Sequence, residues 1–251
     1  MKQSSQAYKE DLRNASWLIR DGHSDQAIPR LDRLIELDST CSFALRERGH
    51  AKSFTGDHEG AIADCTIHIE RWPTDPKGFT DRASARERAG DRSGAIDDYS
   101  AAIAIDSRHP FAIFQRGRLK AQEGDLIGAI NDFTVSMECS KDGPLSALLN
   151  RGKARHLLGD LTGALEDLTE AMQHEFIPAY APLFRARVLM TAGDYLGAIA
   201  DFSAVIQNSP RLTNAYRERA EAKMRVGDSE GAEEDLQSYA WLGGQDLPAY
   251  S

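Results

Sequence analysis

Hydrophobic positions recur along the chain with the spacing of one helix face. Two segments show the pattern most clearly, and their apolar residues are Ala95, Ile96, Tyr99 and Ile103, and Ala198, Ile199, Phe202 and Ile206. The shared spacing of i, i+1, i+4 and i+8 places all four side chains on one side of an α-helix. The pattern therefore predicts amphipathic helices that each bury one stripe.

A short polar string precedes these stripes and returns at nearly constant distance. "TGDHEGAIAD" (55–64) reappears as "AGDRSGAIDD" (89–98) and, in degenerate form, as "DGHSDQAIPR" (21–30). Its first glycine stands at Gly22, Gly56, Gly90, Gly124, Gly159, Gly193 and Gly227. The spacing is 34 residues, with a single step of 35. A period of this length is typical of an array of stacked helix pairs.

The string contains a residue that ends one helix followed by a residue that begins the next. Glycine adopts the left-handed conformation that closes a helix. The next residue in six copies is an aspartate, which can cap the N-terminus of a new helix: Asp57, Asp91, Asp125, Asp160, Asp194 and Asp228. Each period is therefore predicted to be a helix–turn–helix unit.

Small residues occupy fixed places on both predicted helices. Five residues after the turn glycine stand Ala27, Ala61, Ala95, Ala129, Ala164, Ala198 and Ala232. Seven residues before it stand Ala15, Gly49, Ala83, Gly117, Gly152, Ala186 and Ala220. Small side chains on facing helices allow close approach. A further glycine early in the second helix, such as Gly94, costs about 1 kcal/mol relative to alanine and so indicates a close contact there.

These features, together with Pro73 and Pro210, resemble the tetratricopeptide repeat (TPR). The resemblance covers residues 8–246 as seven repeats, with a lead at 1–7 and a tail at 247–251. The predicted repeats are 8–41, 42–75, 76–109, 110–143, 145–178, 179–212 and 213–246. The resemblance implies an all-α, right-handed α-α superhelix whose first helices line a concave groove that binds proteins or peptides.

Charged residues also follow the period. Eight residues before the glycine stand Arg48, Arg82, Arg116, Arg151, Arg185 and Arg219, and eight residues after it stand Asp64, Asp98, Asp132, Asp167, Asp201 and Asp235. The first repeat lacks both, which favours pairing within a repeat. A second cation follows most of these arginines by four residues, as Arg86 follows Arg82, and shared acidic partners would relieve the repulsion. We interpret the set as a structural ion-pair ladder; the alternative is a charged binding strip.

The helix positions that resemble the family's groove hold different residues in each repeat. In the middle repeats they are Phe111, Phe114, Arg118, Leu149, Lys153, Tyr180, Leu183 and Arg187. This set suits a protein or peptide with acidic and apolar residues. In the alternative interpretation the aromatic rings pack between repeats and the cations are only solvated. The family's carboxylate clamp for chaperone tails is incomplete, since Asp81 stands where an asparagine is needed.

Two irregularities interrupt the period. One extra residue falls near Gly143–Pro144, and we expect a tolerated loop insertion or a small change in pitch. The last predicted helix carries Tyr239, Trp241 and Leu242, although the last helix of a repeat array usually has a polar outer face. Either the tail folds back over Trp241, or this surface forms a homodimer contact.

Composition narrows the function classes. The net charge of -9 argues against nucleic acid as the main partner. The sequence has no apolar run long enough to cross a membrane and no signal peptide, so we expect no membrane association. Three separated cysteines, Cys41, Cys65 and Cys139, predict reduced thiols in a cytoplasmic protein.

Catalytic and cofactor motifs are missing from the sequence. We find no HExxH, GxSxG or GxxxxGK[ST] string, and the seven histidines show no metal-ligand spacing. We therefore expect no enzyme activity, no cofactor and no metal. The leading hypothesis is a scaffold that binds a partner segment in its groove. The alternatives are an assembly module that acts through its C-terminal helix, or the recognition subunit of an enzyme on another chain.

Overall fold

A computed structural model describes residues 2–140, 145–174 and 180–243, with side chains from residue 8 onward. The described residues form fourteen α-helices and no strands. The first seven helices are α1 (Lys2–Arg20), α2 (Ser24–Leu37), α3 (Ser42–Phe54), α4 (His58–Arg71), α5 (Pro76–Arg88), α6 (Arg92–Ile105) and α7 (Pro110–Gln122). They are followed by α8 (Leu126–Cys139), α9 (Leu145–Leu158), α10 (Leu161–Ala171), α11 (Tyr180–Ala192), α12 (Tyr195–Asn208), α13 (Thr213–Arg225) and α14 (Ser229–Trp241).

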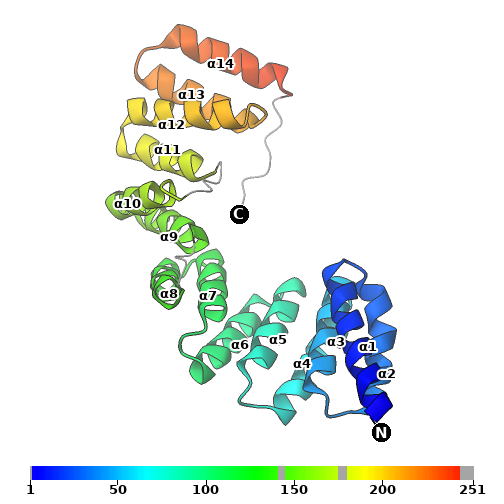
Figure 1. Cartoon of the computed structure of the whole chain (residues 1–251). Helices are drawn as coiled ribbons and strands as arrows, with labels where there is room; N and C mark the ends of the chain where they lie inside the picture. Colours follow the sequence, from blue (N-terminus) through cyan, green and yellow to red (C-terminus); the bar gives the residue numbers. More distant parts are fainter. Residues whose placement is uncertain (1, 141–144, 175–179, 244–251) are drawn as a thin grey trace. The chain divides into compact units, whose positions relative to one another are not determined.

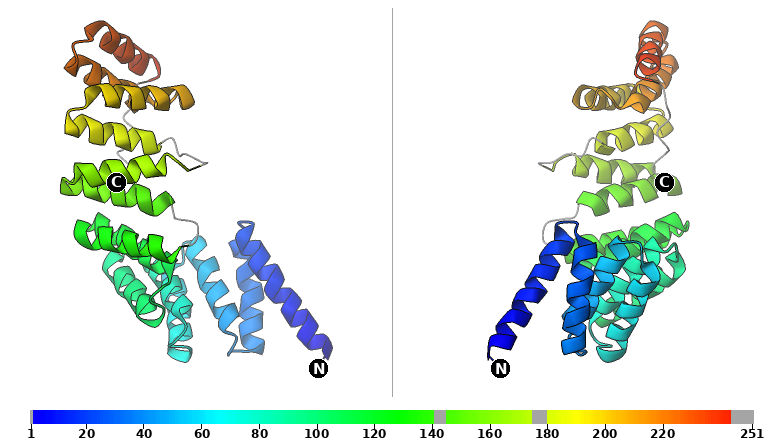
Figure 2. Two further views of the ribbon diagram at one scale, coloured as in Figure 1. Left: turned by 60° about the vertical axis from the view of Figure 1, so that its left-hand side comes forward. Right: turned by 90° about the vertical axis from the view of Figure 1, so that its right-hand side faces the viewer.

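The chain divides into two compact units, residues 1–119 and 120–251, with the boundary inside α7. Figures 1 and 2 show consecutive helices packed side by side within each unit. We describe each unit by itself, so the right-handed superhelix of the whole chain stays a prediction. The predicted lead differs from the structure, because α1 already begins at Lys2. The insertion at Gly143–Pro144 and the tail at 247–251 lie outside the described residues.

The turn inside each repeat has the predicted form. Gly56 has a φ of +90°, and the amide of Asp57 donates to the carbonyl of Lys52 at 2.9 Å, which closes α3. The Asp57 carboxylate then accepts a hydrogen bond from the amide of Gly60 at 2.9 Å and caps α4. The degenerate first repeat carries His23 in place of the aspartate, and α2 has no side-chain cap.

The same geometry explains the glycine early in the second helix of the other six repeats. A Cβ atom on Gly60 would collide with the carboxylate of Asp57 that caps the helix. The corresponding glycine in the third repeat, Gly94, has the same relation to Asp91. The close contact expected from the sequence is therefore with the capping side chain.

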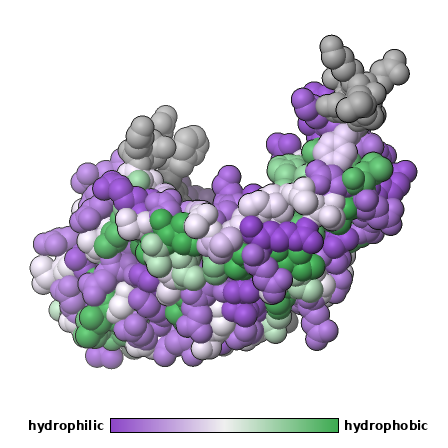
Figure 3. Space-filling model, turned by 90° about the horizontal axis from the view of Figure 1, so that it is seen from below, coloured by the Kyte–Doolittle hydropathy of each residue, from purple (hydrophilic) through white to green (hydrophobic). Residues whose placement is uncertain are grey.

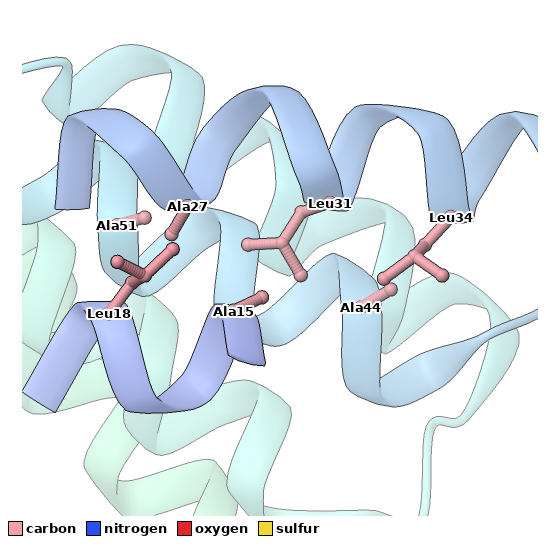
Figure 4. Close-up of a cluster of buried hydrophobic side chains, with 7 residues drawn as sticks. All are labelled: Ala15, Leu18, Ala27, Leu31, Leu34, Ala44 and Ala51. Atoms are coloured by element: carbon pink, nitrogen blue, oxygen red, sulfur yellow. The ribbon is translucent and has the colours of Figure 1, made fainter. Parts of the chain in front are cut away.

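The small residues of each pair form the centre of the core. Figure 4 shows the first cluster, in which Ala15 and Leu18 of α1 face Ala27 and Leu31 of α2. All four are buried, and Ala44 and Ala51 of α3 close the cluster from the next repeat. The second helix α2 thus packs against the first helices of its own and the following repeat. On the face drawn in Figure 3, hydrophobic residues lie in separate patches among hydrophilic ones.

Candidate functional site

The periodic charges form bidentate pairs between the two helices of a repeat. Arg48 donates from Nε and Nη2 to the two carboxylate oxygens of Asp64, at 2.8 and 2.6 Å. The other pairs with this geometry are Arg82–Asp98, Arg151–Asp167, Arg185–Asp201 and Arg219–Asp235. Arg116 and Asp132 belong to different units, so their pairing stays a prediction. We call these pairs and the groups bonded to them the seam.

A second cation shares most of these aspartates. Lys223 lies 3.0 Å from Asp235, and burial of Asp235, which would raise its pKa, is outweighed by the hydrogen bonds from Arg219 and Lys223, so that its pKa is lowered. The equivalent contacts are Lys52–Asp64, Arg86–Asp98, Lys120–Asp132 and Arg155–Asp167, at 2.8 to 3.0 Å. The repulsion that the sequence places on the first helix is thereby relieved.

The arginines of the seam also reach the preceding repeat. Arg219 Nη1 donates to Ser203 Oγ at 2.9 Å, and Arg82 Nη1 donates to Thr66 Oγ1 at 3.2 Å. The same bond joins Arg116 to Ser100, Arg151 to Thr134 and Arg185 to Thr169, while Arg48 uses Asp32. Sequence analysis missed this link, although a hydroxyl residue stands ten places after the turn glycine in five repeats. Arg48, Arg82, Arg151, Arg185 and Arg219 therefore each tie three helices together.

Two of the predicted groove residues are buried and offer no surface to a partner. Leu149 is 2% exposed and packs with Leu168 and Val188, and Leu183 is 8% exposed in the cluster of Phe202. The prediction is wrong for these two leucines because their position in the first helix faces the helices packed against it. Tyr180, by contrast, is 48% exposed.

The remaining predicted residues of unit 2 gather around one aromatic ring. Lys153 Nζ of α9 lies 3.9 Å from the ring centroid of Phe184 on α11, and Arg187 Cζ lies 5.5 Å from it. Tyr180 packs edge-on against the same ring at 6.5 Å. We call Lys153, Tyr180, Phe184 and Arg187 the α9–α11 surface.

The two cations of this surface differ in their partners. Arg187 donates two hydrogen bonds of 2.7 Å to Glu218, which raises the pKa of its guanidinium. Among the described residues, no carboxylate lies within 4.0 Å of Lys153 Nζ. Burial and the charge of Arg187 lower the pKa of Lys153. Lys153 is thus a half-buried cation that no carboxylate of the described residues neutralises.

The predicted groove residues of unit 1 lie on α7. Phe111 is 47% exposed, whereas Phe114 is half-buried. Arg118 bonds to Gln115 at 2.9 Å and also contacts the carboxylate of Glu87. Because Arg118 and Lys153 belong to different units, the predicted row of cations stays a prediction.

A charged cluster in unit 1 was not anticipated. Asp81 of α5 accepts from Arg46 at 2.6 Å and lies 2.9 Å from His50 Nε2, both on α3. The hydrogen bond to Asp81 raises the pKa of His50. Burial would raise the pKa of Asp81, but the bonds and charges of His50 and Arg46 outweigh it and lower that pKa. The cluster joins neighbouring repeats, and the positions of His50 and Asp81 correspond to those of Arg187 and Glu218 in unit 2.

Two chemically reactive side chains of α4, Cys65 and His68, are buried. His68 is fully buried between Ser42 and Asp75, and burial lowers its pKa. Burial raises the pKa of the Cys65 thiol to about 12, which keeps it protonated. The described part of the chain contains no group of three or more acidic, histidine or cysteine side chains suited to a metal ion. None of its helices is both long and apolar enough to span a bilayer.

Comparisons with known proteins rest on structure alone. No protein-family model matches the sequence, and no curated protein shows a significant match. A tetratricopeptide repeat protein from Parabacteroides merdae superimposes with a TM-score of 0.68 at 20% identity, covering 95% of this chain and 94% of that one. The C-terminal part of a TPR repeat-containing protein from Cytophaga hutchinsonii gives 0.77 at 15% identity, covering 94% and 96%.

A third neighbour is YrrB, described as a TPR protein with an unusual peptide-binding site. It has a TM-score of 0.63 at 18% identity and covers 72% of this chain and 93% of its own. Consecutive helix pairs, the 34-residue period and these neighbours agree with one another. The described chain therefore has the all-α fold of tetratricopeptide repeat proteins, with fourteen helices arranged as seven helix–turn–helix repeats.

Proposed function

We propose that this chain is a non-catalytic scaffold that binds a protein segment with acidic and apolar residues at the α9–α11 surface. The observation that carries the proposal is the state of Lys153. Its ammonium is half-buried and lies beside Arg187, and no carboxylate of the described residues neutralises it. A carboxylate supplied by a partner would provide the missing counter-ion.

The surroundings of Lys153 suit such a segment. The exposed ring of Tyr180 offers apolar contact area, and aromatic and arginine side chains are frequent anchors at protein interfaces. Removal of water by the bound segment strengthens the attraction between Lys153 and an acidic residue. Among structures with this fold, YrrB has a peptide-binding site, which supports peptide binding as the kind of function.

The test is selection from a phage-displayed library of random peptides against the full chain. We expect the selected peptides to be enriched in Asp or Glu next to aromatic or aliphatic residues. Their binding should weaken at least tenfold in Lys153→Glu and weaken with added salt. Selected peptides without acidic enrichment, or with unchanged affinity for Lys153→Glu, would contradict the proposal.

A matched control separates local from general electrostatics. Arg211 is an exposed cation in the connection between α12 and α13 and is not one of the residues of the α9–α11 surface. Arg211→Glu changes the net charge by the same amount as Lys153→Glu. Peptide binding should survive Arg211→Glu within about a factor of two, since the charge of an exposed side chain is screened by salt.

A further inference from the structure

Unit 1 contains a groove between its first two odd-numbered helices that the proposed function does not use. It has a volume of about 630 Å³ and lies between α1 and α3. Its lining residues are Lys9, Leu12, Arg13, Ser16, Arg20 and Phe43. We call it the α1–α3 groove. No acidic residue lines it, although the chain as a whole carries a net charge of -9.

The cations of this groove lack counter-ions. Lys9, Arg13 and Arg20 are all exposed on α1. Arg20 donates to the backbone carbonyl of Ser16 at 3.3 Å, and no carboxylate of the described residues lies within 4.0 Å of any of the three charged groups. The arginines of the seam, by contrast, each hold a carboxylate of their own repeat wherever both partners lie in one unit. The groove is therefore an electropositive surface without internal neutralisation.

A buried hydroxyl in the groove also lacks a partner. Ser16 is 8% exposed, and its Oγ makes no hydrogen bond within the described part of the chain. Buried polar groups in native proteins are normally paired, so an orphaned hydroxyl that lines a groove points to an external hydrogen-bonding group. The apolar lining, Leu12 and the 43% exposed ring of Phe43, adds surface for hydrophobic contact.

The helix α14 carries the complementary chemistry. It contains no Lys, Arg or His, and three of its carboxylates, Glu230, Glu233 and Glu234, are exposed. Leu236 is 46% exposed and Trp241 is 85% exposed. Of the described helices, α13 is the one packed against α14.

The two helices also match in spacing. Glu230, Glu234, Gln237 and Trp241 follow one another at i, i+4, i+7 and i+11 on one side of α14. Lys9, Arg13, Ser16 and Arg20 have the same spacing on α1. A helix laid along the groove parallel to α1 can therefore present Glu230 and Glu234 to Lys9 and Arg13, and its amide to the orphaned hydroxyl, with Trp241 beside Arg20.

We infer that the α1–α3 groove binds α14 of a second copy of this chain. Glu230 and Glu234 neutralise Lys9 and Arg13, while the ring of Trp241 packs against the guanidinium of Arg20. The contact joins two different surfaces, so it is head-to-tail and can continue from copy to copy. This self-association is independent of the segment-binding proposed for the α9–α11 surface.

The test uses two variants, each of which disables one side of the contact. The head variant is Arg13→Glu with Arg20→Glu, and the tail variant is Glu234→Ala with Trp241→Ser. Light scattering at low ionic strength should show that the mass of the wild type rises with concentration, while each variant alone stays monomeric. An equimolar mixture should form a one-to-one dimer, because the intact groove of the tail variant meets the intact α14 of the head variant.

Controls make each outcome decisive. Arg33→Glu alters an exposed cation on α2 outside the groove and should associate like the wild type. Circular dichroism on both variants checks that they remain folded. A wild type that stays monomeric at its solubility limit, a head variant that dimerises by itself, or a mixture that remains monomeric would each overturn the inference; the second result would instead indicate a symmetric contact through α14.

Discussion

The seam and the α9–α11 surface lie on the same first helices but follow opposite rules. In the seam, the same residue types make the same bonds in one repeat after another, with Arg151 held by Asp167 and by Thr134 of the preceding repeat. On the α9–α11 surface, two positions further along the helix, Lys153 has no acidic partner among the described residues and lies instead over the ring of Phe184 in the next repeat. Residues that repeat therefore build the array, and residues that vary distinguish one part of it from another.

The strongest test of this difference removes a seam carboxylate. Asp98 is 3% exposed and holds both Arg82 and Arg86. Asp98→Ala leaves two partly buried cations facing each other, and we expect a loss of about 3–5 kcal/mol in the free energy of unfolding. Chemical denaturation measures it.

The adjacent residue provides the control for that substitution. Asp97 is exposed and lies on the outer side of the same helix, α6. Asp97→Ala should change stability by no more than about 0.5 kcal/mol. Equal losses for the two variants would mean that the seam is not structural and would favour the binding-strip alternative.

Much of the seam could be predicted from one sequence because its residues recur. The joint absence of Arg and Asp from the first repeat indicated pairing within a repeat, and the structure places Arg48 on Asp64 in this way. The residues of the Arg219–Ser203 hydrogen bond also recur with the period. The sequence alone does not show that they meet, because the bond joins neighbouring repeats.

The varying surface was harder to predict. Leu149 and Leu183 share a helix offset with Arg46, yet the leucines are buried while Arg46 bonds to Asp81 at the edge of α5. A position at the border of a helix face turns inward or outward according to the size and polarity of its neighbours. A single sequence without repetition at that position does not contain this information.

The link between repeats should be weaker than the pair within a repeat. Ser203→Ala removes the acceptor of Arg219 Nη1, and we expect a loss of about 1 kcal/mol, the usual size of one hydrogen bond. Ser238→Ala is the matched control, because Ser238 bonds only to the backbone carbonyl of Glu234 in its own helix. If both variants lose the same stability, the hydroxyl contributes through its helix and the cross-repeat bond is unimportant.

The capping glycine should show a coupling of about the same size. Alanine is favoured over glycine in helices by about 1 kcal/mol, but at Gly94 it displaces the capping carboxylate of Asp91, which is worth about 1 kcal/mol. Gly94→Ala should therefore give almost no gain in the wild type and a gain of about 1 kcal/mol in the Asp91→Ala background. If Gly94→Ala changes stability equally in the wild type and in Asp91→Ala, the close contact with the capping carboxylate is not the reason for the glycine.

The smallest expected effect concerns pH and the cluster around His50. Because the pKa of His50 is raised in the folded state, its stabilisation is complete below its unfolded pKa of about 6.5 and is lost as the pH rises through the folded value. The advantage of the wild type over His50→Gln in thermal unfolding should therefore shrink between about pH 6 and pH 8. His68, whose lowered pKa acts with the opposite sign, is present in both proteins and cancels from this difference. A constant or growing advantage would mean that His50 and Asp81 do not form a charged pair.

The most direct measurement compares two residues of α9 that stand two positions apart. The free energy of unfolding should fall by about 3 kcal/mol in Arg151→Ala, which breaks the seam at Asp167 and Thr134. In Lys153→Ala it should change by less than about 0.5 kcal/mol, because the substitution removes an unneutralised cation beside Arg187. A large loss in Lys153→Ala, or no loss in Arg151→Ala, would contradict the division between a repeating framework and a varying binding surface.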